Sequence, residues 1–370
     1  MQYDAAITAS ALNTTLTSNA ALSSSTVDAI STILKLDTAT TLPVATSTGT
    51  NLSVNFDPTT GQVVAPEVVF FSDLGAAGSN VTVTIPSVVA NSSAILFNTS
   101  ANVTATIGNS AAVTPTAAVE GTAATRVVVS GSGNDTITIT DNVNTHVDAG
   151  AGNDTITTAG GNDTVVLNGG TNTVNTGAGN DVIYAGNGID TINGGSGYDV
   201  VNVSNLANYT VSVSNGSVVL NSATSGQATL TNVQFVASVT GNDTLAIVSN
   251  QSEATSIRLY EAVLGRDADA SGTQFWVGQA QAGVSTTSIA NQFLNSVEYN
   301  AAHTTPLSDG AFIQSLYQGA LGRAADTDGL VYWAQQLATG HTRADVAVGI
   351  VGSVEAQNHD TGVIVVTGQV

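Results

Sequence analysis

Residues 150–201 read GAGNDTITT AGGNDTVVL NGGTNTVNT GAGNDVIYA GNGIDTING GSGYDVV, a tandem repeat of nine residues without a slip. Each unit has an Asp or Asn at one fixed position and an apolar residue two positions later. The polar residues are Asp154, Asp163, Asn172, Asp181, Asp190 and Asp199, and the apolar residues are Ile156, Val165, Val174, Ile183, Ile192 and Val201. An earlier copy, GSGNDTI, occupies residues 131–137. Self-similarity at a fixed period predicts a repeat architecture.

The spacing suits a glycine-rich turn followed by a very short strand. Glycine permits positive φ, so a six-residue turn can curl its carbonyl oxygens inward, and the Asp then closes the turn with a carboxylate. Six to eight oxygen ligands suit Ca²⁺ better than Zn²⁺ or Mg²⁺. Nine residues make half a coil, so units two repeats apart should stack. We therefore predict one column at 154, 172 and 190 and another at 163, 181 and 199.

The repeat G-G-x-G-x-D-x-U-x resembles the RTX family of calcium-binding β-rolls. That resemblance assigns residues 126–202 to a parallel β-roll, with each ion held between two stacked turns. The implied calcium ligands are Asp135, Gly150, Gly152, Asp154, Gly161, Asp163, Asn172, Gly177, Gly179, Asp181, Gly186, Gly188, Asp190, Gly195, Gly197 and Asp199. Asn172 carries a neutral amide, so sites at that turn should bind more weakly. The alternative is a metal-free glycine-rich solenoid, although no Lys or Arg lies between Asp135 and Asp199 to balance the carboxylates.

The rest of the chain reads as mainly β with an α-helical C-terminal part. Val27, Ile30, Ile33 and Leu34 fall at helical spacing, which predicts a helix capped near Ser25. The segments are an N-terminal helical segment at 1–37, an antiparallel β-sandwich-like domain at 38–125, the roll, a strand cap of the roll at 203–250, a helical module at 251–358 and a tail at 359–370.

The helical module contains a second internal repeat with a longer period. Leu259-Tyr260 matches Leu316-Tyr317, Trp276 matches Trp333, and Ser296-Val-Glu298 matches Ser353-Val-Glu355. This pattern resembles the DUF4214 repeat, a helical module found beside RTX repeats and in surface-layer proteins. We expect Arg266 and Arg323 to pair with the matching glutamates of each copy, and the tryptophans to be core anchors.

Each copy also carries an acidic loop, with Asp267 and Asp269 in the first and Asp326 and Asp328 in the second. The first resembles the start of an EF-hand loop, which makes these four residues candidate calcium ligands. The bidentate Glu of an EF-hand is missing from both loops. A capped turn that joins two helices is the alternative.

The charge of the chain limits its partners. Six Lys and Arg stand against 27 Asp and Glu, a formal net charge of −21, so we expect neither nucleic acid nor an anionic membrane as a partner. We expect no membrane insertion and no cleaved signal peptide. No H-E-x-x-H or G-x-S-x-G motif occurs, cysteine is absent, and the histidines are scattered, so we expect no enzyme. His146 is expected to be an exposed position of the roll.

The composition is acidic, poor in lysine and sulfur, and rich in Thr, Val, Ala and Asn, and it resembles that of bacterial surface-layer proteins. We expect a secreted structural protein that assembles with copies of itself, exported by type I secretion with the signal in the tail, and with cell-surface polysaccharide as a further partner. An adhesin or biofilm-matrix protein without a lattice is the alternative, and a secreted hydrolase is a third. The threonines form no clear flat array in the sequence, which argues against an ice-binding surface.

Overall fold

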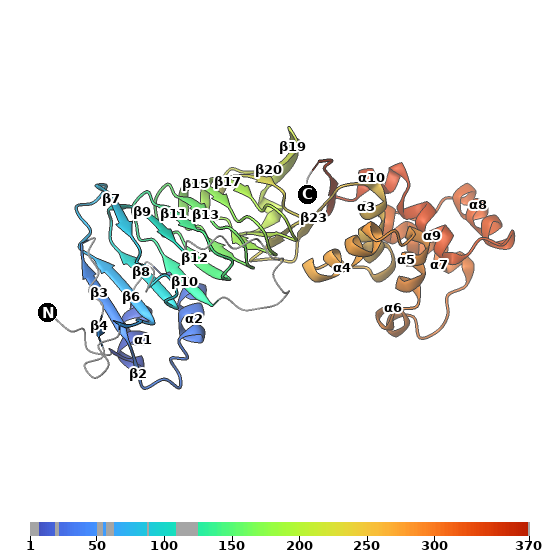
Figure 1. The fold of residues 1–370 in the computed structure, drawn as a ribbon. Helices are drawn as coiled ribbons and strands as arrows, with labels where there is room; N and C mark the ends of the chain where they lie inside the picture. The colour runs from blue at the N-terminus through green and yellow to red at the C-terminus, as the bar shows by residue number, and fades with distance from the viewer. Residues whose placement is uncertain are drawn as a thin grey trace. The chain divides into compact units, whose positions relative to one another are not determined.

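The computed structural model describes residues 7–18, 22–49, 55–56, 63–86, 89–108 and 125–368. The chain forms two compact units, and they are treated separately below. The first contains residues up to Ser204 together with 208–233, and the second contains 205–207 together with the residues from Gln234 onward. Figure 1 shows strands in the first unit and mainly helices in the second. The predicted fold class, mainly β with a helical C-terminal part, is confirmed.

The first unit is built on two sheets of stacked parallel strands. The first sheet has the order β18 (Val200–Val203), β16 (Val182–Tyr184), β14 (Thr164–Val166), β12 (Thr145–Asp148), β10 (Arg126–Val129), β8 (Ala94–Asn98), β6 (Val68–Ser72) and β3 (Val44–Thr48). The second has the order β17 (Asn187–Asn193), β15 (Gly169–Asn175), β13 (Thr155–Thr157), β11 (Thr136–Ile139), β9 (Asn102–Ile107) and β7 (Asn80–Thr84). Successive repeats add strands alternately to the two sheets, as a β-roll requires.

The core of the roll lies between the sheets. The apolar residue of each repeat points inward, and Ile156, Val165 and Ile183 are fully buried. This alternation confirms the predicted role of the repeat's apolar position.

The predicted antiparallel pairing of residues 38–125 is wrong. Val69 pairs with Ile95 and Val83 with Ala105, both in parallel, so these strands continue the sheets of the roll. The physical reason is that a stacked coil offers its neighbour the same hydrogen-bonding edge whether or not a glycine-rich turn precedes it. In the described part of this segment, antiparallel pairing is limited to the hairpin of β4 (Asn55–Phe56) and β5 (Val63–Val64) and to Thr41–Leu42, which pairs with Ile7–Thr8. The predicted strand at 51–56 lies mostly outside the described residues.

Two helices cover the outer face of the first sheet. α1 (Ala9–Ser18) and α2 (Ser24–Ile33) pack with Leu12, Leu16 and Ile30 against strand side chains such as Val68 and Val127. The predicted helix is therefore present, with Ser23 rather than Ser25 as its N-cap. β1 (Ile7–Thr8), which precedes α1, pairs antiparallel with β2 (Thr41–Leu42), which follows α2.

An antiparallel hairpin closes the second sheet. β21 (Gly226–Thr231) adds in parallel to β17, and β20 (Ser217–Ser222) and β19 (Thr210–Ser214) then follow antiparallel. The change of direction ends the stacking of coils, and it matches the predicted strand cap for this part of 203–250.

The exposed face of the second sheet carries two columns of polar side chains. The first column runs Thr82, Thr104, Thr136, Thr155, Thr173, Thr191 and Thr229, and the second runs Thr84, Thr106, Thr138, Thr157, Asn175, Asn193 and Thr231. All of these side chains are exposed or half-exposed. The expectation that the threonines form no flat array is therefore wrong, because strands separated by turns of unequal length still align in register.

The second unit combines a small sheet with helices. Its sheet has the order β24 (Val363–Val365), β23 (Thr244–Val248) and β22 (Phe235–Ser238). Its helices are α3 (Gln251–Leu259), the π-helical segment η2 (Tyr260–Leu264), α4 (Ala270–Gln281), α5 (Thr286–Leu294), α6 (Val297–Ala302), α7 (Asp309–Leu321), α8 (Thr327–Ala338), α9 (Arg343–Val351) and α10 (Val354–His359). Within the described chain, no helix is long and apolar enough to cross a membrane.

The two helical repeats use the same contacts. Arg266 donates to both carboxylate oxygens of Glu298 at 2.6 and 3.0 Å, and Arg323 does so to Glu355 at 2.5 and 2.9 Å. Both predicted pairs are therefore confirmed. Trp276 lies against Phe293 with ring centroids 4.7 Å apart, which supports its expected role as a core anchor.

Candidate metal site

The aspartates of the repeat form a ladder along each edge of the roll. On one edge, the backbone N–H of Asp135 donates to Asp154 Oδ1 at 2.8 Å, and that of Asp154 donates to Asn172 Oδ1 at 2.9 Å. Asn172 Nδ2 then donates to Asp190 Oδ1 at 2.9 Å. The predicted column at 154, 172 and 190 is confirmed, and Asp135 extends it by one coil.

The opposite edge carries the second predicted column. The N–H of Asp163 donates to Asp181 Oδ1 at 2.7 Å, and that of Asp181 donates to Asp199 Oδ1 at 3.0 Å. One coil earlier, the N–H of Thr145 donates to Asp163 Oδ1 at 2.7 Å. Each carboxylate therefore uses one oxygen to hold the neighbouring coil.

The glycines let consecutive turns stack without a gap. A Cβ added to Gly179 would lie 1.8 Å from the carbonyl oxygen of Gly161, and one added to Gly152 would lie 2.0 Å from that of Gly133. At both positions φ is also positive. An added Cβ would also lie within 2.6 Å of a carbonyl oxygen of the preceding coil at Gly150, Gly177, Gly186, Gly188, Gly195 and Gly197. At Gly161 the approach is looser, 3.0 Å from the backbone nitrogen of Asn144. The predicted glycines thus place the backbone of each turn directly against the carbonyl oxygens of the preceding turn.

Burial disfavours the ionised form of these aspartates. Desolvation by burial is the main cause in every case, and it raises the pKa of Asp135 and Asp190 to about 6. It raises the pKa of the remaining four, Asp154, Asp163, Asp181 and Asp199, to about 7. Repulsion by Asp199 adds to the rise at Asp181. A bound cation would reverse this penalty.

The second oxygen of several carboxylates has no hydrogen-bond partner among the described residues. These buried atoms include Oδ2 of Asp135, Asp163 and Asp181. The nearby hydroxyls of Thr158 and Thr176 donate to carbonyl oxygens instead, at 2.6 and 2.8 Å. An unpaired buried carboxylate oxygen is costly, so each column has an oxygen ready to coordinate a cation.

These residues fit calcium through a mixed set of oxygens. In the described residues, no three acidic or histidine side chains meet at one point, so a side-chain cluster does not exist. Carboxylate oxygens and the carbonyl oxygens of the glycine turns are the ligands that Ca²⁺ accepts. The site is therefore repetitive, with one carboxylate contributed by each turn except the turn of Asn172, which contributes an amide.

The acidic loops of the helical unit are arranged differently. Asp269 Oδ1 accepts from the N–H of Gly272 at 2.8 Å, and Asp326 Oδ1 accepts from that of Gly329 at 2.7 Å, so both cap helices. Asp267 and Asp328 are exposed and do not join them in a cluster. The structure supports the capped-turn alternative.

The sequence missed a polar cluster between α2 and the roll. Asp148 Oδ2 accepts from the hydroxyl of Thr26 at 2.7 Å, and that hydroxyl also lies 3.0 Å from His146 Nε2. His146 is only 4% exposed, so the expectation of an exposed histidine is wrong. Neither His146 nor Asp148 occupies the aspartate position of the repeat. Their contact with α2 joins segments far apart in the chain and leaves no pattern in the sequence.

Comparisons with known families agree with this geometry. The model of the RTX calcium-binding nonapeptide repeat (4 copies) matches residues 140–174 and 167–201. The model of DUF4214, a domain of unknown function, matches residues 233–302 and 290–359. No curated protein and no solved structure matches the chain significantly. The chain therefore contains RTX repeats, which bind calcium, followed by two copies of DUF4214.

Proposed function

We propose that this calcium-binding protein is a secreted structural protein that assembles into a bacterial surface layer or extracellular sheath, without enzymatic activity. RTX repeats are typical of secreted proteins. The aspartates and glycines of the two columns hold the calcium ions, which order the roll and, through it, the assembly. At the low calcium concentration of a cytosol the coils of the roll after β12 would stay unfolded, which suits export through a type I secretion apparatus.

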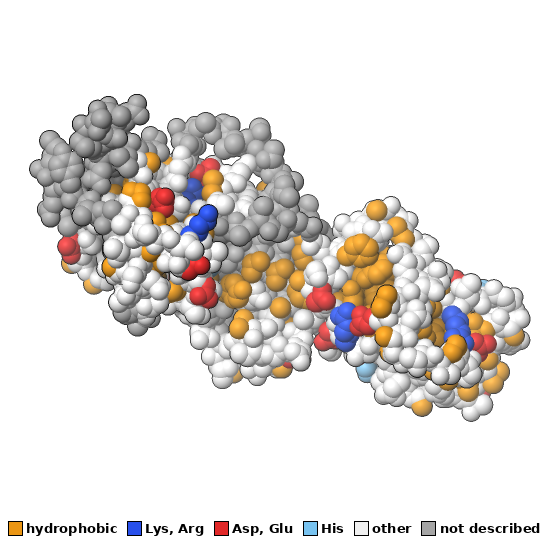
Figure 2. Space-filling model, turned by 90° about the horizontal axis from the view of Figure 1, so that it is seen from below, with side chains coloured by type: hydrophobic (Ala, Val, Ile, Leu, Met, Phe, Trp, Pro, Cys, Tyr) orange, Lys and Arg blue, Asp and Glu red, His pale blue; other side chains and the backbone are white. Residues whose placement is uncertain are grey.

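The observation that carries the structural role is a duplicated exposed apolar surface. Phe275 and Tyr332 are each 54% exposed and occupy matching positions of the two helical repeats. Val297 and Val354 also match, and they are 88% and 71% exposed. Figure 2 shows apolar side chains on the face of the helical unit in view, with basic and acidic side chains beside them. Two equivalent sets of exposed apolar side chains on one protomer would provide the multiple contacts that an open lattice requires.

Negative-stain microscopy and light scattering in EGTA and then in millimolar calcium test this role. We expect extended ordered sheets or tubes only with calcium. The variant Val297→Ser/Val354→Ser should stay dispersed, whereas Val213→Ser, at an exposed valine of β19 outside both repeats, should still assemble. Protein that folds with calcium but remains monomeric would refute the lattice and favour the adhesin.

The threonine columns favour a second candidate function, binding to ice. Neighbouring side chains within a column lie about 4.8 Å apart, which is the spacing between strands. The two columns lie about 6.6 Å apart along each strand. A rigid face of hydroxyl and methyl groups with these two regular spacings suits a crystalline ligand. The side chains are already ordered before binding, so binding costs little conformational entropy. No charged residue belongs to either column.

Inhibition of ice growth in calcium tests the second candidate. Thr155→Tyr and Thr173→Tyr place bulky rings in the middle of the first column and should abolish it, while Thr210→Tyr, exposed on β19, should not. If the column variants lose assembly instead, the face is a contact between copies of the chain.

A further inference from the structure

One basic residue stands at the N-terminal end of the second aspartate column. Arg126 pairs in register with Thr145 in the first sheet. The N–H of Thr145 donates to Asp163 Oδ1, and the same bond recurs from Asp163 to Asp181 and from Asp181 to Asp199. The column therefore begins with a cation, one coil before Thr145.

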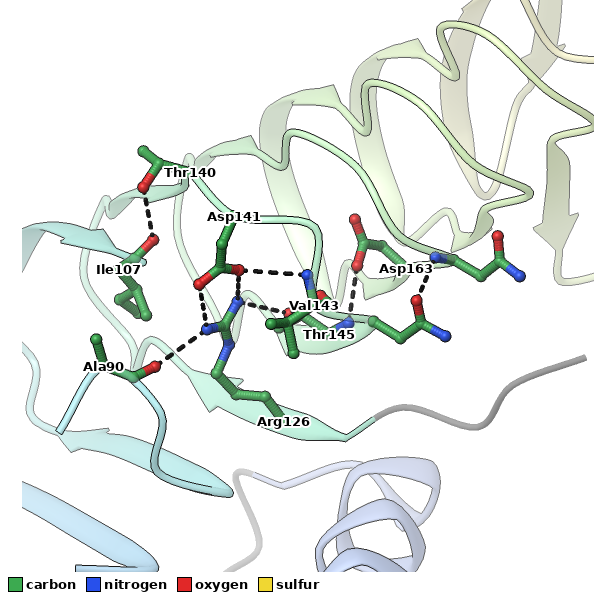
Figure 3. Close-up of polar contacts among 10 residues, drawn as sticks. Ala90, Ile107, Arg126, Thr140, Asp141, Val143, Thr145 and Asp163 are labelled. Atoms are coloured by element: carbon green, nitrogen blue, oxygen red, sulfur yellow. Dashed lines mark hydrogen bonds and ion pairs between the residues drawn. The ribbon is translucent and has the colours of Figure 1, made fainter. Parts of the chain in front are cut away.

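The two terminal nitrogens of the Arg126 guanidinium are held by oxygen atoms, while its buried Nε has no partner among the described residues. It donates to the two carboxylate oxygens of Asp141 at 3.0 and 2.6 Å, to the carbonyl of Ala90 at 3.1 Å and to the hydroxyl of Thr145 at 2.9 Å. Arg126 is 1% exposed and Asp141 is 5% exposed. Figure 3 shows this group of residues at the turn before β12, beside the bond from Thr145 to Asp163.

The partners come from turns on both sides of the coil that contains Arg126. Ala90 precedes β8, and Asp141 precedes β12. The guanidinium thus bridges turns with a carboxylate and a carbonyl, which are also the kinds of oxygen available to calcium farther along the column. Beyond Arg126, no Lys or Arg occurs before Arg258, so the later turns have no such cation of their own.

We propose that Arg126 is a permanent cation that replaces calcium at the first turn of this column, so the coils up to β12 fold without calcium. The proposal rests on calcium binding by the later aspartates. An arginine stays charged at any physiological pH, and a buried carboxylate such as Asp141 requires a counter-charge. The N-terminal coils then form a template, and each later coil adds to a preformed edge once calcium is present.

Hydrogen exchange of the full chain, followed by mass spectrometry, tests the template. In calcium-free buffer, we expect protection of peptides from β8, β10 and β12 and rapid exchange of those from β14, β16 and β18. Millimolar calcium should protect the second group. If calcium changes neither group, the calcium columns themselves are refuted. If both groups require calcium, the role of Arg126 is overturned.

Two variants separate charge from shape. Arg126→Gln leaves Asp141 without its partner, so β10 and β12 should lose protection in calcium-free buffer. Arg126→Gln/Asp141→Asn removes both charges and should restore that protection, whether or not the single variant folds with calcium. Arg258→Gln breaks the buried pair with Asp360 in the helical unit and should leave β10 and β12 unchanged. A single variant with undiminished protection, or a double variant without protection, would overturn the proposal.

Discussion

Asn172 interrupts a column of aspartates while keeping its hydrogen bonds. Its Oδ1 accepts from the N–H of Asp154 and its Nδ2 donates to Asp190, so the amide holds both neighbouring coils without a charge. We predict that Asn172→Asp weakens the roll without calcium, because two carboxylates then face each other. With calcium the new ligand should raise affinity at that turn by about tenfold, equivalent to about 1.4 kcal/mol.

Calorimetric titration with calcium measures this change. Asn175→Asp adds the same charge at an exposed position of β15 and serves as the control. Equal affinities of the two variants would show that the amide at 172 is not in a calcium site.

The buried aspartates also predict how stability depends on pH. Their pKa values in the folded, calcium-free chain are raised by burial to about 6 or 7, above the ordinary value of about 3.9. The folded chain therefore binds more protons than the unfolded chain. The stabilising contribution is complete below the unfolded pKa and is lost as the pH rises through about 7.

Circular dichroism of calcium-free protein should accordingly show a roll that is more completely folded at about pH 5 than at about pH 8, where its later coils are unfolded. Saturating calcium should reverse the trend, because protons then compete with the ion. A roll whose calcium-free stability rises with pH would contradict the raised pKa values.

At the scale of the element, the turns depend on glycine for close stacking. Gly179→Ala places its Cβ 1.8 Å from the carbonyl of Gly161, where the backbone cannot move without opening the coil. We expect a loss of about 3 kcal/mol or more in the free energy of unfolding with calcium bound. The matched control is Gly216→Ala, which has positive φ but open space, and should lose only about 1–2 kcal/mol. Chemical denaturation measures both, and similar losses would refute the packing explanation.

The nine-residue period was sufficient to predict the two columns and the inward apolar positions. It could not reveal that β3, β6 and β8 continue the same coil, because the glycine and aspartate signature is absent before Gly131. The threonine columns were missed for a related reason. Thr136 and Thr155 are close in sequence, whereas Thr191 and Thr229 are separated by a whole hairpin, so their alignment depends on register and not on spacing.

Contacts between remote segments were equally invisible in the sequence. The site of Arg126 joins the turn at Ala90, the strand at Thr145 and the carboxylate of Asp141, and none of these follows from the repeat. The helical pairs were predictable because each occurs twice. Arg266 with Glu298 has the same separation as Arg323 with Glu355.

At the scale of the whole molecule, the two units should respond differently to calcium. The candidate ligands of the roll all lie in the first unit, and the acidic loops of the second are helix caps. We predict that calcium removal unfolds the later coils of the roll while the helices persist. Far-ultraviolet circular dichroism should lose part of its strand component in EGTA and retain its helical component. Magnesium at the same concentration should not restore the strands, because it tolerates such ligand sets poorly. Simultaneous loss of both components would show that the units fold as one.

The direction of the hydrogen bonds in the roll has a mechanical consequence. Each coil bonds to the next through its strands and its aspartate ladder, so these bonds lie along the stacking axis. Tension along that axis would break the hydrogen bonds of one coil before those of the next, starting from an end of the roll. Each coil released would yield 18 residues, or about 60 Å of extended chain. A roll under strain would therefore lengthen in steps and dissipate energy, and calcium concentration would set the force at which each step occurs.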